Sequence, residues 1–376
     1  MKKIHVSLVM EIPYFALSGA GLRPGAIPSF IMHKVEPEDF SELLDYLKRN
    51  GYRTLGIKEY YEYLSGKKHD KDKKIIITFD DGLRNNWSVV YPILKKFSMK
   101  AVFYVNPEKI MESGQARYNL EDVWQSKISH SELDIIEEKE MFINWEEARK
   151  MQKSGIIDIE SHSLFHQLCF TKNKIIDFQR PGKDGNSVYP WLFSAMDLGS
   201  EDSIWGAPVY PFSSRMIAKR FYDDAGLRQA CIDFVKENQG IAFFSIKNWK
   251  NKLINFVKDY SKANELKTYF ESDLESEINI RDSLLNSKLL IEQKLDKACE
   301  HFAYPWNISG DLSLLWLKEL GFKTVFRFMN GWNIPKRGCD LYGLSRVEGY
   351  WIKSLPGKGR KIIWDKLLSR ITRLGF

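Results

Sequence analysis

A run of three isoleucines followed by threonine and phenylalanine, Ile75–Phe79, is the strongest hydrophobic signal in the first part of the chain. Short apolar runs rich in β-branched side chains are typical of buried β-strands. This run leads directly into Asp80, Asp81 and Gly82, and a glycine at such a position lets the chain turn sharply. We therefore predict a buried strand that carries two adjacent carboxylates at its carboxyl end.

Strand-like and helix-like segments alternate through the first half of the chain. Short apolar runs predict further strands at residues 30–35, 52–57, 101–105 and 156–160. Amphipathic segments between these runs predict helices at residues 40–50, 58–64, 86–97 and 145–153. Such alternation favours an α/β sheet or barrel with parallel strands.

The alternation stops between residues 167 and 299 and resumes over residues 300–357. The interrupted part begins with loops rich in Tyr, Trp, Phe and Pro, and the patterns over residues 214–238 and 247–299 predict helices. We interpret it as a large, mostly helical insertion into a discontinuous domain formed by residues 1–166 and 300–357, packed over the site. Its aromatic loops fit equally well a set of sugar-stacking walls or a small separate core.

The C-terminal segment, residues 358–376, mixes Lys and Arg with apolar side chains at helical spacing. This pattern predicts a basic amphipathic helix. Such a helix can lie on an anionic membrane surface. It can equally dock on the body of the protein, and the pattern leaves both interpretations open.

Composition narrows the class of protein. The chain of 376 residues is 44% hydrophobic and 28% charged, which is typical of a globular protein and not of a disordered or fibrous one. Its net charge of +7 is too diffuse to predict nucleic-acid binding. The four cysteines lie far apart without metal-site spacing, so we expect reduced thiols. Because no export signal or membrane span is predicted, we expect a cytoplasmic protein. Peripheral contact with the inner membrane surface through the C-terminal helix is one of the two interpretations left open above.

The candidate chemistry lies at two strand ends. Adjacent carboxylates such as Asp80 and Asp81 repel each other unless a cation neutralises them. His162 and His166 follow the strand predicted at 156–160, and their four-residue spacing predicts two imidazoles on one face of a helical turn. Since catalytic groups in parallel α/β folds collect at the carboxyl ends of strands, we expect a divalent metal site here.

Three short segments form a set that resembles a known family. Thr78–Gly82 matches a T-F-D-D-G motif, Ser161–His166 contains H-[ST]-x-x-H, and Phe302–Asn307 is similar to F-A-Y-P-[YW]-[GN]. These are the motifs of the polysaccharide deacetylase family, also called NodB-homology or carbohydrate esterase family 4. The opening, Met32–Leu64, resembles the poly-N-acetylglucosamine deacetylase branch. The resemblance implies a distorted (β/α) barrel of the NodB-homology type.

The resemblance also implies roles for individual residues. Asp81, His162 and His166 match the ligands of Zn²⁺ or another divalent first-row metal. Asp80 matches the general base, and the backbone N–H of Trp306 matches the group that stabilises the oxyanion.

The chain departs from the family pattern in two places. The third motif usually begins with an Arg that orients the catalytic Asp, and here Ala303 or its neighbours occupy that place. The fifth motif usually presents a His as general acid, and here Arg346 stands there instead. In the branch named above the acid is the early His, which corresponds to His33. We infer that Arg346 supplies the positive charge that steadies Asp80.

These features predict metal-dependent hydrolysis of the N-acetyl group of an N-acetylated sugar, in glycan or cell-surface polysaccharide biosynthesis. The substrate is expected to be a free or lipid-linked sugar or glycan. Two alternatives stay open: a deformylase or deacylase of a lipid-linked amido sugar, and a non-catalytic carbohydrate-binding homologue.

Overall fold

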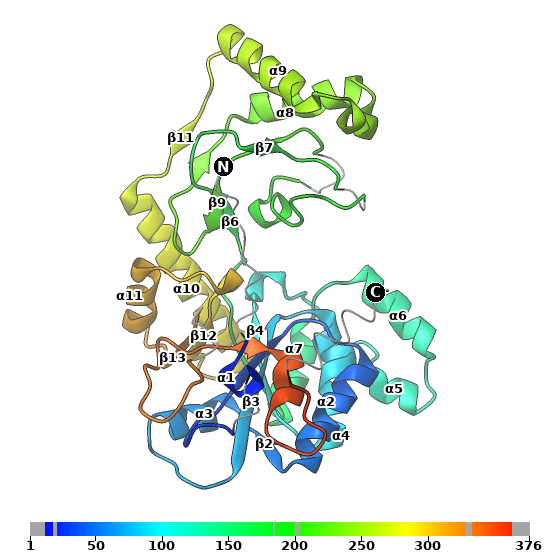
Figure 1. The fold of residues 1–376 in the computed structure, drawn as a ribbon, viewed down its shortest axis with the longest axis vertical. Helices are drawn as coiled ribbons and strands as arrows, with labels where there is room; N and C mark the ends of the chain where they lie inside the picture. The colour runs from blue at the N-terminus through cyan, green and yellow to red at the C-terminus, as the bar shows by residue number, and fades with distance from the viewer. Residues whose placement is uncertain (1–11, 18–20, 183–184, 200–203, 328–332, 363–376) are drawn as a thin grey trace. The chain divides into compact units, whose positions relative to one another are not determined.

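The computed structural model describes residues 12–17, 21–182, 185–199, 204–327 and 333–362 (Figure 1). The contacts within the chain divide it into two compact units. Unit 1 comprises Met1–Leu164, Ser283–Ser309 and Leu314–Phe376, and unit 2 comprises Phe165–Asp282 and Gly310–Ser313. The expected insertion, 167–299, thus shares residues 167–282 with unit 2, whereas residues 283–299 belong to unit 1.

Unit 1 is organised around one parallel sheet. The eight strands follow the order β13-β12-β5-β4-β3-β1-β14, with β2 paired to β3, and every pairing in this sheet is parallel. The strands are β1 (Ser29–Met32), β2 (Tyr52–Thr54), β3 (Lys73–Asp81), β4 (Ala101–Val105), β5 (Ile157–Ser161), β12 (His301–Ala303), β13 (Thr324–Phe326) and β14 (Val347–Glu348). The sheet curls into a half-barrel. The predicted α/β fold with parallel strands is confirmed.

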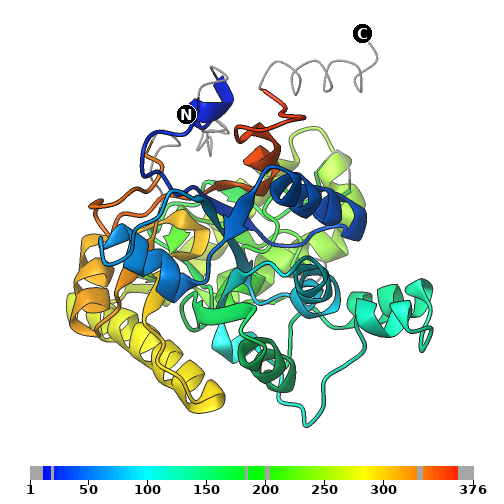
Figure 2. The ribbon, with the colours of Figure 1, turned by 90° about the horizontal axis from the view of Figure 1, so that it is seen from below.

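Helices surround the curled sheet, whereas the two helices between residues 120 and 139 project away from it (Figures 1 and 2). They are α1 (Tyr14–Leu17), α2 (Pro37–Arg49), α3 (Ile57–Leu64), the π-helix η1 (Asn86–Val90), α4 (Tyr91–Phe97), α5 (Leu120–Trp124), α6 (His130–Lys139) and α7 (Trp145–Lys153). Two further helices, α10 (Asp273–Leu295) and α11 (Asp311–Glu319), begin in unit 2 and end in unit 1.

Local sequence explains where these helices begin and end. In α2, Pro37 occupies the first turn, where its missing N–H costs nothing, and Gly51 follows the helix at a φ of 70°. In α7, Asn144 and Glu147 form a reciprocal capping box. The single helix predicted over 86–97 is wrong in one respect, because its first part is the π-turn η1.

The core of unit 1 fills the concave side of the sheet. Its members include Ile76, Val102, Tyr104, Ala303 and Phe326, all of which are fully buried. Strand β3 is buried along its whole length except for Lys73 and, partly, Asp81. A strand buried on both faces needs a continuous apolar run, and 75–79 supplies it. The consequence is that β3 presents Asp80 to the protein interior and Asp81 to the rim.

The described residues of unit 2 form three small antiparallel strand pairs, and two α-helices lie wholly within the unit. The paired strands are β6 (Leu168–Phe170) with β9 (Phe212–Ser214), β7 (Asp177–Phe178) with β8 (Pro208–Val209), and β10 (Phe221–Tyr222) with β11 (Tyr269–Phe270). The helices are α8 (Ala225–Glu237) and α9 (Trp249–Ala263). The helices predicted at 214–238 and 247–299 are therefore too long, since strands interrupt both ranges.

The aromatic side chains of unit 2 do not all fit the same one of the two interpretations, sugar-stacking walls or a small separate core. Tyr210 is buried and packs edge-on against Phe170 and Phe221, as a small separate core requires. Trp191, in contrast, has 63% of its surface exposed.

Three further expectations concerned the cysteines, membrane-spanning helices and the C-terminal helix. All four cysteines are free thiols, three of them buried. Within the described ranges, no helix is both long enough and apolar enough to cross a membrane. The predicted amphipathic helix at 358–376 falls almost wholly outside the described residues.

Candidate active site

The functional side chains gather at the carboxyl ends of neighbouring strands of unit 1. Strand β4 lies between β3 and β5, and its register places Val105 beside both Asp81 and Ser161. The next strand, β12, pairs Phe302 with Ser161. The end of β3 and the loop after β5 therefore meet at one level of the sheet.

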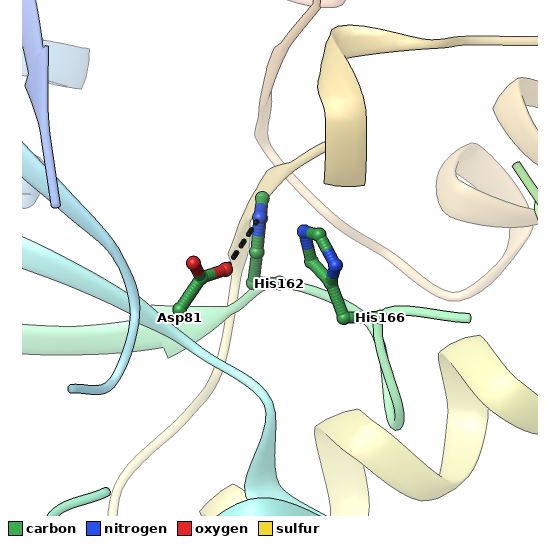
Figure 3. A group of neighbouring side chains, drawn as sticks. All are labelled: Asp81, His162 and His166. Carbon is green, nitrogen blue, oxygen red and sulfur yellow. Dashed lines mark ion pairs between the residues drawn. The ribbon is translucent and has the colours of Figure 1, made fainter. Parts of the chain in front are cut away.

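Asp81, His162 and His166 form a compact group of potential metal ligands (Figure 3). Each offers one ligand atom, and these atoms all lie within 4.8 Å of one another. The Nε2 atom of His162 is 3.6 Å from Oδ1 of Asp81. Ligands of a tetrahedral zinc ion lie about 3.3–3.5 Å apart, given metal–ligand distances of about 2.0–2.2 Å. Among the described residues this is the one such group, and its atoms fit a divalent metal.

The two imidazoles reach this position through an irregular loop. Ser163 and His166 adopt left-handed backbone conformations, with φ values of 68° and 58°. The helical turn expected from the spacing is therefore wrong. Asp81 is left-handed as well, with a φ of 73°. Such conformations are uncommon outside glycine and cluster at functional sites.

A backbone contact fixes the tautomer of His162. Its Nδ1 atom lies 2.8 Å from the carbonyl oxygen of Ala303, so Nδ1 donates a hydrogen bond and Nε2 keeps its lone pair for the site. Burial lowers the pKa of His162, although Asp80 and Asp81 favour its charged form. A neutral imidazole with Nε2 available is the form that binds metals.

Asp80 is held by Arg346 in the protein interior. Nη1 and Nη2 of Arg346 donate to Oδ1 and Oδ2 of Asp80 at 2.6 and 2.7 Å, and both side chains are only 2% exposed. Nη2 also donates to Oδ1 of Asn307 at 3.4 Å. Burial alone raises the pKa of Asp80, but the charge and hydrogen bonds of Arg346, together with His162, lower that pKa to about 2. Asp80 is therefore a carboxylate at neutral pH.

His33 and Trp306 lie at the same edge of the sheet. Met32 pairs with Phe79, so His33 follows at the level of Asp80. The side chain of His33 is exposed, and its positive charge lowers the pKa of Asp80. Trp306 lies in the turn after β12 with a left-handed φ of 59°.

Sequence reasoning missed two residues near this edge. Asn307 adjoins Trp306 and bonds Arg346, and its place in the third motif was the available signal. Glu348 ends β14 beside Ile31 of β1. Burial raises the pKa of Glu348, while His33 and Arg346 oppose that rise. No sequence pattern pointed to Glu348.

Residues 67–180, which contain β3 and the loop with both histidines, match the family model described as polysaccharide deacetylase. Over these residues the chain is similar to the polysaccharide deacetylase family. A segment of 91 residues is 34% identical to YxkH of Bacillus subtilis, a protein named for this family, and covers 22% of this chain and 33% of that protein.

Two further proteins are similar to parts of this chain or to its fold. A segment of 122 residues is 25% identical to poly-β-1,6-N-acetyl-D-glucosamine N-deacetylase of Escherichia coli K12, covering 32% of this chain and 16% of that protein. The matched segments thus span a third or less of both curated relatives. The solved deacetylase domain of BpsB from Bordetella bronchiseptica aligns over 86% of this chain and 95% of that domain, with a TM-score of 0.51 and 15% identity. At this identity the structural likeness shows the fold alone.

Proposed function

We propose that the protein is a metal-dependent N-deacetylase that acts on an N-acetylated sugar of a glycan or cell-surface polysaccharide. The observation that carries the proposal is the grouping of one carboxylate and two imidazoles within 4.8 Å, beside a second, buried carboxylate paired with Arg346. The name of the Escherichia coli relative supports the class of substrate.

In this reaction the amide C–N bond breaks, a C–O bond to water forms, and acetate and a free amine leave. A divalent metal held by Asp81, His162 and His166 supplies Lewis acidity, which lowers the pKa of water and polarises the amide carbonyl. The chain must also accept a proton from water, stabilise an oxyanion and protonate the amine.

Asp80 is the proposed proton acceptor. A carboxylate with a pKa near 2 takes up protons weakly, so the water that it deprotonates must already be acidified. Arg346 bonds both oxygens of Asp80 and thereby fixes the plane of the carboxylate. Oδ2 of Asp80 lies 3.6 Å from Nε2 of His162, which keeps this base next to the metal ligands. The role of Arg346 is therefore to hold Asp80 ionised and oriented.

The remaining two roles fall to His33 and Trp306. We assign to His33 the protonation of the departing amine, because His33 follows β1 at the level of Asp80 and interacts electrostatically with it. We assign to the backbone N–H of Trp306 the stabilisation of the oxyanion, in keeping with the third motif.

Acetate release from N-acetylhexosamine oligosaccharides, measured with and without chelator, tests the proposal. Asp80→Asn and His162→Ala are each expected to reduce the rate by about 10²–10⁴-fold. Asp177→Asn is the matched control, because Asp177 is also a buried aspartate in an ion pair but belongs to unit 2. Full activity in a variant that carries both Asp80→Asn and His162→Ala would refute the proposal.

The same assay separates the alternatives. Formate in place of acetate would identify a deformylase of an amido sugar, and metal-free protein without hydrolysis would identify a carbohydrate-binding homologue. Lipid linkage of the substrate, membrane contact and cytoplasmic location stay predictions.

A further inference from the structure

We propose that Asn85 and Asn86 form a clamp that positions the backbone of His33, and with it the proton donor of the reaction. The inference rests on the function proposed for His33. Nδ2 of Asn86 donates to the carbonyl oxygen of His33 at 3.0 Å. Oδ1 of Asn85 accepts from the N–H of Val35 at 2.9 Å. The two bonds hold the two peptide groups on either side of Lys34.

The clamp acts where the sheet no longer fixes the chain. Strand β1 ends at Met32, and His33 is the first residue beyond it. Although the side chain of His33 is exposed, the two asparagines that hold its backbone are only 4% and 0% exposed. Both hydrogen bonds are partly buried, and a lower local dielectric strengthens such a bond relative to one in water. Asn85 and Asn86 thus restrain the backbone at His33, beyond the end of β1.

Further hydrogen bonds fix the segment that carries Asn85 and Asn86. Asn86 opens the π-helix η1, in which the N–H of Tyr91 bonds to the carbonyl of Asn86. The backbone N–H of Arg84 donates to the carbonyl of Met141 at 2.7 Å. Nε1 of Trp87 donates to the carbonyl of Arg117 at 2.8 Å. Isolated π-turns are rare and frequently occur at functional sites.

One short segment of the chain carries both the proposed metal ligand Asp81 and the two asparagines that hold the proposed proton donor, His33. Strand β3 ends at Asp81, the proposed metal ligand, and Asn85 and Asn86 follow a few residues later in the chain. The segment that presents the metal ligand therefore also sets the distance to the proton donor. A misplacement of about 1 Å in such a group costs about 10²-fold in rate.

A mutant cycle separates this role from a purely structural one. Asn86→Ala is expected to lower kcat for acetate release by at least about 10-fold while KM changes less than about 2-fold. In a His33→Gln background the same substitution is expected to change kcat less than about 2-fold, because the group that it positions is gone. Equal losses in both backgrounds would overturn the proposal.

Two further variants complete the cycle. Ser88→Ala is the matched control, since Ser88 is buried in the same π-turn and its hydroxyl donates to the carbonyl of Arg84 at 3.2 Å. It is expected to leave kcat unchanged in both backgrounds. Asn86→Ser, whose shorter side chain does not reach the His33 carbonyl, replaces Asn86→Ala if that variant does not fold.

Amide hydrogen exchange provides a readout that does not depend on activity. Exchange over residues 33–36 is expected to accelerate at least about 10-fold in Asn85→Ala and Asn86→Ala and to stay unchanged in Ser88→Ala. Unchanged exchange in both asparagine variants would overturn the clamp. If the unmodified protein releases no acetate, or if His33→Gln keeps full activity, the proposed function or the role of His33 fails instead, and exchange still decides the clamp.

Discussion

Replacement of Arg346 by methionine removes both hydrogen bonds to Asp80 and keeps a long side chain in the space. The pKa of Asp80 is about 2, against an ordinary value of 3.8, because the charge and hydrogen bonds of Arg346 outweigh the effect of burial. At about 1.4 kcal/mol per pKa unit, this difference corresponds to about 2 kcal/mol. Loss of one partner from a buried pair costs about 3–5 kcal/mol. We therefore expect Arg346→Met to lose about 2–5 kcal/mol of unfolding free energy at pH 7.

The pH dependence of this loss has a definite sign. A carboxyl group whose pKa is lower in the folded state stabilises that state above its unfolded pKa, here 3.8. The contribution disappears as the pH falls through the folded pKa of about 2. Unmodified protein should thus lose about 2 kcal/mol through Asp80 between pH 5 and pH 2, and Arg346→Met should lose much less over that range.

Urea unfolding at several pH values measures these quantities, with chelator present so that bound metal adds no stability. Arg215→Met is the control, because Arg215 forms a comparably buried pair with Glu271 in unit 2. It should lower stability at pH 7 but leave the kcat of folded protein unchanged, whereas Arg346→Met should lower kcat by about 10²-fold. Arg346→Lys keeps the positive charge but not the pair of hydrogen bonds to Asp80. Its unfolding free energy and its kcat should therefore lie between those of the unmodified protein and those of Arg346→Met. An unfolding free energy within about 0.5 kcal/mol of the unmodified protein in Arg346→Met would refute the reasoning.

Three further predictions concern individual roles. Asp80→Asn should lower kcat by about 10²–10⁴-fold without loss of bound metal, and a parallel loss of metal would assign Asp80 to the ligand set. His33→Gln should lower amide hydrolysis by about 10²–10⁴-fold but should barely affect hydrolysis of p-nitrophenyl acetate, whose leaving group needs no proton; equal losses on both substrates would contradict the role of His33. Chelator should abolish acetate release and lower the melting temperature, with Zn²⁺ restoring both, and activity that survives complete removal of metal would contradict the metal-dependent mechanism.

The sequence predicted the parts of the site that depend on local pattern. The run at 75–79 is apolar because β3 is buried on both faces, so the same pattern located the strand and the two aspartates at its end. His162 and His166 do lie near each other and near Asp81, but not because they share a face of a helical turn. Left-handed conformations at Ser163 and His166, and not a helical face, direct the imidazoles, and these depend on the surrounding packing.

Long-range contacts were harder to predict. Arg346 and Asp80 are 266 positions apart in the sequence, and their pairing was inferred only from a departure from the family pattern. The clamp formed by Asn85 and Asn86 gave no signal, because hydrophobic periodicity over 86–97 is the same for an α-helix and for one that begins with a π-turn. Glu348 was not predicted, because it lies near the site only through the pairing of β14 with β1, and no local sequence pattern indicates that pairing.

Metal content per chain in single-ligand variants tests the central claim most directly. After dialysis against Zn²⁺ and removal of excess ion, the unmodified protein and Asp80→Asn should each retain about one equivalent. Asp81→Ala, His162→Ala and His166→Ala should each retain well under about half an equivalent. Full metal retention in all three of these variants would contradict the account, since Asp81, His162 and His166 would then not share an ion.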